Sequence, residues 1–170
     1  LMPLAVLLEN IAGIYASLWA GASVVLLPMD KIGLSGSSQL NGEQMVQALS
    51  RSGATTAIFT PQTLQCVTEV LERNPELRLP LRFAAVGGAS VSPRLLQRAS
   101  AIGLPVFEGY GLSECASVVC LNTPAHYRPG SVGRPLPHVR LTISKDGEVL
   151  IAGQPFAGYL GEQPTAEECW

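Results

Sequence analysis

Short apolar runs that alternate with helix-forming segments constrain the fold of this chain more than any other feature. Residues 55–59, 81–86 and 104–107 each have the length and apolar character of a buried strand. The segments between them are long enough to form helices, and strands joined by helical crossovers pair in parallel. The sequence therefore predicts an α/β fold with a mostly parallel sheet flanked by helices.

Capping signals mark the helices that should flank this sheet. Asn41, with Gln44 three residues later, predicts a helix start, and Gly53 predicts its end. Residues 60–74 and 92–103 each begin with a hydroxyl residue followed by proline, and proline is favoured at the first helical position. These signals predict three helices. The first precedes the strand at 55–59, the second follows that strand, and the third lies between the strands at 81–86 and 104–107.

The N-terminal region is almost entirely apolar. Residues 4–20 are predicted to form a helix buried on nearly all sides, and residues 23–27 a central strand, with a loop over 29–40. Residues 11–29 carry no charge, but Gly13 and Gly21 interrupt the run. We therefore expect no transmembrane segment, while peripheral membrane contact remains open.

Composition excludes several functional classes. The chain is 47% hydrophobic and 14% charged, which is typical of a folded α/β protein and not of a disordered one. Its net charge of -2 and scattered arginines exclude a nucleic-acid partner. The four cysteines lack paired zinc-type spacing, so free thiols and a cytoplasmic location are expected. Neither end coincides with a start or stop signal, and we expect a fragment of a longer protein.

The amino-acid composition of the chain changes after residue 123. Prolines and glycines dominate an irregular connector, and apolar runs at 139–143 and 148–151 then flank Asp146–Gly147. Asp-Gly between two such runs is a strong hairpin signal. We therefore predict a first part over residues 1–128 and, over residues 129–170, the beginning of a smaller antiparallel β region.

The run Val-Phe-Glu-Gly-Tyr-Gly-Leu-Ser-Glu at residues 106–114 concentrates chemically distinct groups on what should be irregular backbone after a strand. Glycines on both sides of Tyr110 permit sharp turns and close approach of a ligand, and the ring offers a stacking face. The hydroxyl of Ser113 beside the carboxylate of Glu114 suits phosphate oxygens and magnesium. These groups predict a nucleoside triphosphate site.

A second glycine-rich strand end supports this prediction. Gly87, Gly88 and Ala89 directly follow the strand predicted over 81–86. Ligands of open α/β sheets bind beyond the carboxyl ends of the strands, so both glycine-rich ends should line one crevice. A serine hydrolase is disfavoured, because Cys115 stands where the nucleophile motif has its second glycine. A dinucleotide fingerprint is disfavoured because Glu114 replaces its last glycine.

These motifs carry a resemblance to a known family. Glu-Gly-Tyr-Gly-Leu-Ser-Glu resembles the adenine-and-phosphate motif of the adenylate-forming (acyl-CoA synthetase, AMP-binding) superfamily. Segments at residues 1–13, 87–93, 130–135 and 146–161 resemble its other motifs in the right order, most like those of long-chain fatty acid–CoA ligases. The resemblance implies an acetyl-CoA synthetase-like N-terminal subdomain that binds nucleotide and acyl groups, followed by the start of a β-barrel-like subdomain.

The resemblance also implies a two-step reaction and residue roles. A fatty acid carboxylate attacks ATP to give acyl-AMP, and a thiol, commonly coenzyme A, then accepts the acyl group. Tyr110 would stack on adenine and Glu108 would accept from its amino group, while Ser113 would contact phosphate and Glu114 would ligate Mg²⁺. Backbone approach to the nucleotide and acyl group would occur at the small residues of both strand ends, namely Gly87, Gly88, Ala89, Gly109 and Gly111.

Departures from the family pattern leave alternatives open. Val6 stands where relatives carry a histidine that lines the acyl pocket. The family's phosphate loop would precede Leu1, and Lys145, in the predicted hairpin turn, cannot serve as the catalytic lysine of its C-terminal lid. We therefore expect the 170-residue chain alone to be inactive and to self-associate through apolar surface. A fatty acyl-AMP ligase that loads a carrier protein and a non-catalytic nucleotide- or acyl-binding relative remain alternatives.

Overall fold

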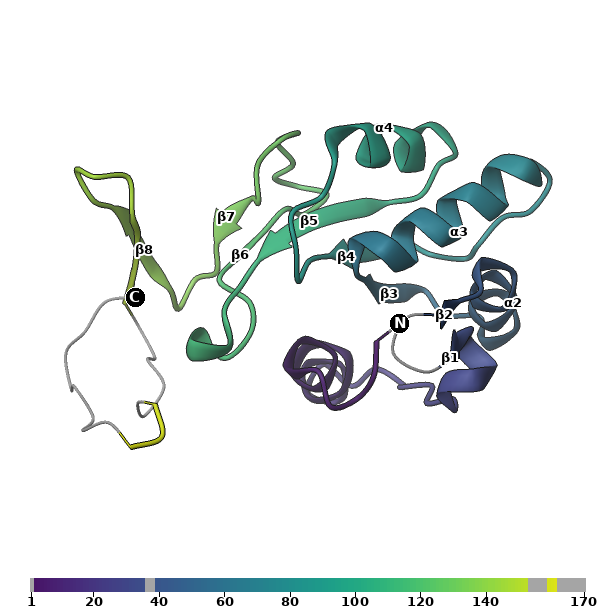
Figure 1. The fold of residues 1–170 in the computed structure, drawn as a ribbon, viewed down its shortest axis with the longest axis horizontal. Helices are drawn as coiled ribbons and strands as arrows, with labels where there is room; N and C mark the ends of the chain where they lie inside the picture. Colours follow the sequence, from purple (N-terminus) through teal and green to yellow (C-terminus); the bar gives the residue numbers. More distant parts are fainter. Residues whose placement is uncertain (1, 36–38, 153–158, 162–170) are drawn as a thin grey trace.

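A five-stranded sheet forms the centre of the computed structural model, which describes residues 2–35, 39–152 and 159–161 (Figure 1). The strand order is β3-β4-β5-β6-β7. The first three strands are parallel, and the last two pair antiparallel. Their bounds are Thr56–Phe59, Phe83–Val86, Val106–Tyr110, Cys120–Leu121 and Arg134–Pro135. The predicted α/β class is confirmed, with the parallel half of the sheet at residues 56–110.

Three helices flank this sheet, two in contact with its strands and one packed against a neighbouring helix, and their ends follow the capping signals. They are α2 (Gly42–Ser52), α3 (Pro61–Arg73) and α4 (Pro93–Ala101). The Asn41 side chain accepts a hydrogen bond from the Gln44 backbone N–H at 3.1 Å, and Thr60 exchanges capping bonds with Thr63. Figure 1 shows α3 and α4 lying along the same side of the sheet. The three predicted helices are therefore confirmed.

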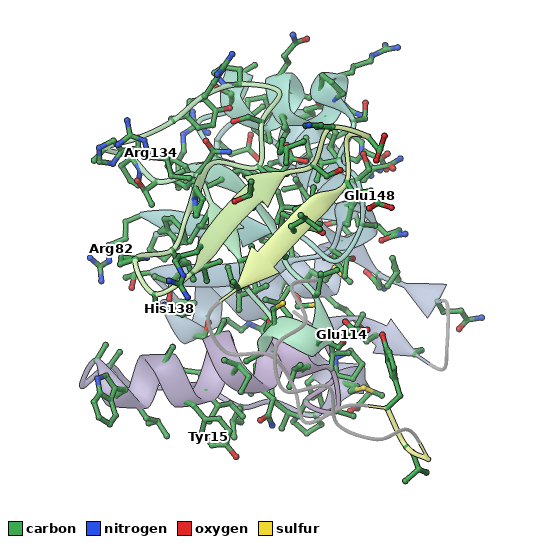
Figure 2. The ribbon with its side chains drawn as sticks, turned by 90° about the vertical axis from the view of Figure 1, so that its left-hand side faces the viewer. Tyr15, Arg82, Glu114, Arg134, His138 and Glu148 are labelled. Carbon is green, nitrogen blue, oxygen red and sulfur yellow. The ribbon has the colours of Figure 1, made fainter. Side chains whose placement is uncertain are left out.

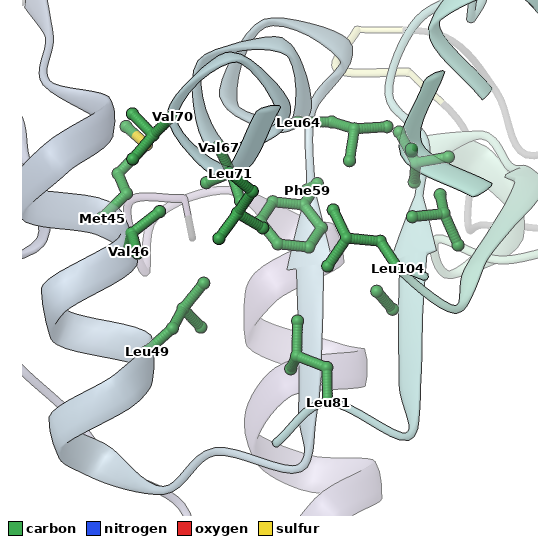
Figure 3. Packing of buried hydrophobic residues seen from close by; sticks show 14 of the residues in the cluster. Met45, Val46, Leu49, Phe59, Leu64, Val67, Val70, Leu71, Leu81 and Leu104 are labelled. Carbon is green, nitrogen blue, oxygen red and sulfur yellow. The ribbon is translucent and has the colours of Figure 1, made fainter. Parts of the chain in front are cut away.

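The main core lies between these helices and the sheet. Phe59, the last residue of β3, is fully buried, and Figure 3 shows its ring among Leu64, Val67 and Leu71 of α3. Ala84, Val86 and Val106 face the same core from β4 and β5. Since side chains alternate along a strand, Phe83 and Phe107 face the opposite side, where their rings stack at 4.9 Å.

The N-terminal helix is exposed, so the prediction of a buried helix over residues 4–20 is wrong. Residues 9–15 form a π-helix (η1, Glu9–Tyr15), followed by α1 (Ala16–Trp19). Trp19 is 94% exposed, and Tyr15 and Leu18 are also exposed. The helix contacts the edge strand β3. No other described element packs on its outer side. Apolar composition favours burial of a helix, but it does not show which other element would cover it.

The prediction of a central strand over residues 23–27 is also wrong. Residues 22–28 have no regular structure, and Val25, Leu26 and Leu27 are exposed. Their composition favours an extended backbone, but a strand also needs a paired neighbour, and within the described residues β3 is the edge of the sheet. The predicted loop over 29–40 contains a short 3₁₀ helix (η2, Met29–Ile32) and two strands, β1 (Leu34–Ser35) and β2 (Gln39–Leu40), paired antiparallel.

The predicted hairpin is confirmed near the end of the described chain. Strands β8 (Arg140–Ile143) and β9 (Val149–Ala152) pair antiparallel around a turn in which Gly147 adopts a φ of 87°. Strand β7 follows residue 128 but pairs with β6, so the central sheet continues past that residue. The boundary expected between the two parts at residue 128 stays a prediction. Residues 153–158 and 162–170 of the predicted second part lie outside the described residues. None of the described helices is long and apolar enough to cross a bilayer.

Candidate nucleotide and acyl site

A pocket of about 250 Å³ lies at the carboxyl ends of β4 and β5. Apolar side chains and glycine backbone dominate its wall. Its lining comes from the N-terminal segment, the end of β4, the end of β5 and the loop that follows it, namely Val6, Leu7, Leu8, Ala85, Val86, Gly87, Gly88, Gly109, Tyr110, Gly111, Leu112, Ser113, Ser117, Val118 and Leu121. The two glycine-rich strand ends therefore share one crevice, as the sequence predicted.

The strand predicted over 104–107 runs on through Glu108, Gly109 and Tyr110, so the prediction of irregular backbone at these three residues is wrong. Val86 pairs with Glu108 at the end of β4, and β5 continues to Tyr110 because β6 takes over as its partner. Gly109 pairs with Leu121 and Tyr110 with Cys120 in this antiparallel ladder. Pairing with Leu121, twelve residues later, overrides the tendency of Gly109 to end a strand.

The loop after β5 closes tightly on itself. A Cβ at Gly111 would overlap the Ser117 carbonyl oxygen and lie 2.6 Å from its carbonyl carbon. The Ser117 N–H donates to the Leu112 carbonyl at 3.0 Å, and the Val119 N–H donates to the Tyr110 carbonyl at 2.8 Å. The short helix η3 (Ser113–Cys115) lies inside this loop and presents Ser113 and Glu114. Gly111 is thus required by close backbone packing, whatever ligand the pocket takes.

Two non-glycine residues in this loop adopt left-handed backbone conformations. Ala116 has a φ of 53° and Ser117 a φ of 93°, and Ser117 is buried. Such conformations are unfavourable for residues with a Cβ and are retained where surrounding contacts hold them. The loop that carries Ser113 and Glu114 is therefore held by its packing against Gly111.

The end of β4 approaches the backbone of β5 closely. A Cβ at Gly87 would lie 3.4 Å from the Gly109 carbonyl oxygen and 3.8 Å from Cδ2 of Leu8, which are ordinary contacts. Gly88 has a φ of 82°, a conformation that favours glycine. Glycine backbone from two strands thus forms one wall of the pocket beside the apolar side chain of Leu8.

Six of the nine predicted site residues line this pocket: Gly87, Gly88, Gly109, Tyr110, Gly111 and Ser113. Ala89, Glu108 and Glu114 are not among its described lining residues. The carboxylate of half-buried Glu108 accepts a hydrogen bond from the Val91 backbone N–H. Burial raises the pKa of the Glu108 carboxyl above its ordinary value, and the bond from Val91 opposes that rise.

Glu114 lies in η3, and its carboxylate accepts a hydrogen bond from a residue far away in the sequence. The Tyr159 hydroxyl donates to Oε1 of Glu114 at 2.9 Å across 45 residues of sequence. The backbone N–H of Glu114 and then this hydroxyl hold the pKa of the Glu114 carboxyl below its ordinary value. Sequence reasoning included Tyr159 in a matching segment but gave it no contact, because nothing local in the sequence connects it to Glu114.

The described residues contain no group of three or more His, Cys, Asp and Glu side chains that could hold a metal ion by themselves. Magnesium commonly binds through one or two carboxylates and completes its coordination with water and substrate phosphate oxygens. Glu114 beside the Ser113 hydroxyl fits that arrangement, since it supplies one ionised carboxylate next to the pocket.

The chain is similar to the long-chain-fatty-acid–CoA ligase FadD15 of Mycobacterium bovis, with 41% identity over 88 residues, 51% of this chain and 15% of that protein. It is also similar to the 2-succinylbenzoate–CoA ligase of Bacillus mycoides, with 34% identity over 108 residues, 61% of this chain and 22% of that protein. The chain thus spans less than a quarter of the length of either relative.

A solved structure shows the same fold. The anthranilate CoA ligase AuaEII, solved in complex with anthranoyl-AMP, superposes with a TM-score of 0.78 at 19% identity over 94% of this chain and 32% of that one. The family model described as AMP-binding enzyme matches residues 1–162, nearly all of the 170. With the glycine-walled pocket and its motif, this match shows that the chain belongs to the AMP-binding, adenylate-forming enzyme family.

Proposed function

We propose that this chain belongs to an ATP-dependent acid–CoA ligase of the long-chain fatty acid type. The observation that carries the proposal is the composition of the pocket. Glycine backbone from Gly87 and Gly109 meets the apolar side chains of Leu8, Leu112 and Leu121 beside the Ser113 hydroxyl. Such a pocket suits a molecule with an apolar chain at one end and a polyanion at the other.

In the proposed reaction, a carboxylate oxygen of the fatty acid attacks the α-phosphorus of ATP. The bond to the bridging oxygen breaks, and acyl-AMP and pyrophosphate result. The thiolate of coenzyme A then attacks the acyl carbon, so that a thioester forms and AMP leaves. Apolar lining excludes water from the acyl-AMP and protects it from hydrolysis.

The residues of this chain have binding and positioning roles in the proposal. Tyr110 stacks on the adenine ring, Ser113 donates to a phosphate oxygen, and Glu114 holds Mg²⁺, which neutralises charge on the phosphates. The contact with Val91 favours a structural part for Glu108, beside its proposed bond to the adenine amino group. Ala89 follows Gly88 in the β4 loop and would contact the nucleotide only through its backbone.

Val6 supports an apolar acid substrate. It lines the pocket with Leu7 and Leu8, so three consecutive residues present mainly apolar surface there. An aliphatic side chain packs against an acyl chain but forms no hydrogen bond with it. Because the substrates are ATP, coenzyme A and a fatty acid, we propose a cytoplasmic enzyme with these small-molecule partners and no nucleic-acid partner.

The test is ATP–pyrophosphate exchange by the protein that carries this chain, with a panel of medium- and long-chain fatty acids and 2-succinylbenzoate. We expect exchange that depends on a fatty acid. Glu114→Ala should reduce it about 100-fold, the loss typical when a group that stabilises transition-state charge is removed. Glu148→Ala is the matched control, because Figure 2 shows that glutamate on the β8–β9 hairpin, apart from Glu114.

The outcomes separate the alternatives. Exchange with 2-succinylbenzoate alone would contradict the fatty acid class. ATP binding without exchange for any acid would favour a non-catalytic relative and overturn the proposal. Thioester formation with coenzyme A, compared with a phosphopantetheine carrier protein, distinguishes the ligase from an acyl-AMP ligase that loads a carrier.

We also propose that the 170-residue chain self-associates. Trp19, Leu18, Val25 and Leu26 are all more than half exposed and lie close together in sequence. Exposed apolar patches of this kind promote association. Light scattering should show oligomers that Trp19→Ser shifts toward monomer, whereas Leu77→Ser, at an exposed site in another part of the chain, should leave them unchanged. A monodisperse wild-type monomer would refute the proposal.

A further inference from the structure

Asn122 is a buried polar residue next to the motif strand, and the proposed reaction gives it no role. It is 1% exposed and directly follows β6. Its Nδ2 donates to the Glu108 carbonyl oxygen at 3.2 Å and to the Ser131 carbonyl oxygen at 2.5 Å. Its Oδ1 accepts from the Arg128 backbone N–H at 3.0 Å. Both ends of this amide are therefore bonded to backbone.

These bonds join two segments that no strand pairing connects directly. On one side is β5 at Glu108, whose carbonyl oxygen also accepts the Asn122 backbone N–H at 3.0 Å. On the other side is a turn at residues 128–131, which the Ser131 hydroxyl closes by donating to the Arg128 carbonyl at 3.0 Å. The Asn122 backbone therefore extends the β5–β6 ladder by one residue, and its side-chain amide bonds to backbone groups of the turn.

The connection leads directly to the pocket. Glu108 precedes Gly109 and Tyr110, both of which line the pocket, and Leu121, which precedes Asn122, lines it as well. Gly133, with a φ of 87°, packs so closely on β6 that a Cβ there would overlap the Leu121 carbonyl group and the Asn122 backbone nitrogen. The segment that follows the turn is therefore in close backbone contact with β6 at Leu121 and Asn122.

We propose that Asn122 is a positioning residue for the nucleotide: its buried amide ties the 128–131 turn to β5 and thereby holds Tyr110 in the orientation that accepts adenine. The inference rests on the proposed function, because it assigns the adenine position to Tyr110. Only an amide supplies two donated bonds and one accepted bond at this site. Aspartate keeps the acceptor for Arg128 but sets a carboxylate against two carbonyl oxygens.

The test compares Asn122→Asp with wild type in the protein that carries this chain. The readouts are the Kd for ATP, the KM for the fatty acid and the melting temperature. We expect the Kd for ATP to rise about tenfold, the equivalent of one hydrogen bond's contribution, while the KM for the acid changes less. Lowering the pH should restore ATP affinity in N122D, because protonation of the introduced carboxyl returns a donor.

Asn74→Asp is the matched control. The Asn74 side chain also donates to a carbonyl, that of Val70 at 2.8 Å, but at the end of α3 and away from the pocket. It should lower the melting temperature and leave the Kd for ATP unchanged. If N122D does not fold, Asn122→Ser provides the same comparison with a smaller polar side chain.

The proposal is overturned if the variant at position 122 lowers the melting temperature but binds ATP as wild type does, since that result describes a purely structural residue. Failure of the proposed function gives a different pattern: wild-type protein that binds ATP but shows no acid-dependent exchange. In that case the Kd comparison at Asn122 still decides whether the residue positions nucleotide.

Discussion

Replacing Gly111 with alanine should lower the free energy of unfolding by about 3 kcal/mol and abolish acid-dependent exchange. The added Cβ would overlap the carbonyl oxygen of Ser117 and come within 3.0 Å of Cα of Val118. Both are backbone atoms, so no side-chain rotation relieves the overlap. Ser117 is already held at a φ of 93°, and the whole loop that carries Ser113 and Glu114 must shift. Chemical denaturation and pyrophosphate exchange measure the two effects.

Gly87→Ala is the control for this prediction. It places a methyl group in the same pocket, but its nearest neighbours lie at 3.4 Å and 3.8 Å, and the backbone there does not need a left-handed conformation. Its free energy of unfolding should stay within about 0.5 kcal/mol of the wild-type value. Equal losses of stability in the two variants would show that the overlap at Gly111 is not the cause.

Replacing Phe59 with alanine should lower the free energy of unfolding by about 3–5 kcal/mol, the range observed when a buried phenylalanine is truncated. Phe59 is fully buried at the end of β3, and it packs among residues from α3 and the neighbouring strands (Figure 3). Denaturant unfolding followed by circular dichroism measures the loss.

Phe83→Ala tests whether burial in this core sets the size of that effect. Phe83 lies on the opposite face of the sheet, is only partly buried, and stacks on Phe107 with an angle of 8° between the rings. Phe83→Ala should lower the free energy of unfolding by less than Phe59→Ala does, because part of the Phe83 side chain is already exposed to water. A larger loss at Phe83 would contradict the assignment of the main core to the helix-covered face.

The two glycine-rich strand ends show how the site depends on both local and distant parts of the chain. Glycine at position 111 is demanded by the return of the loop to Ser117, and the alternation of Gly109 and Gly111 is visible in the sequence. The sequence showed that a compact loop follows the strand, but not that β6 extends β5 through Tyr110. That extension depends on a partner strand at residues 120–121, and the choice of partner is not a local property.

The amino-acid sequence by itself predicted the three capped helices, the positions of the three buried strands and the hairpin. Each depends on neighbours within a few residues, as in the bond from the Gln44 N–H to Asn41 or the turn at Gly147. Only the tertiary structure decided that the N-terminal helix is exposed, that residues 23–27 do not pair, and that Tyr159 meets Glu114. Burial, strand pairing and such contacts depend on which distant surface is available, and local composition carries no information about that.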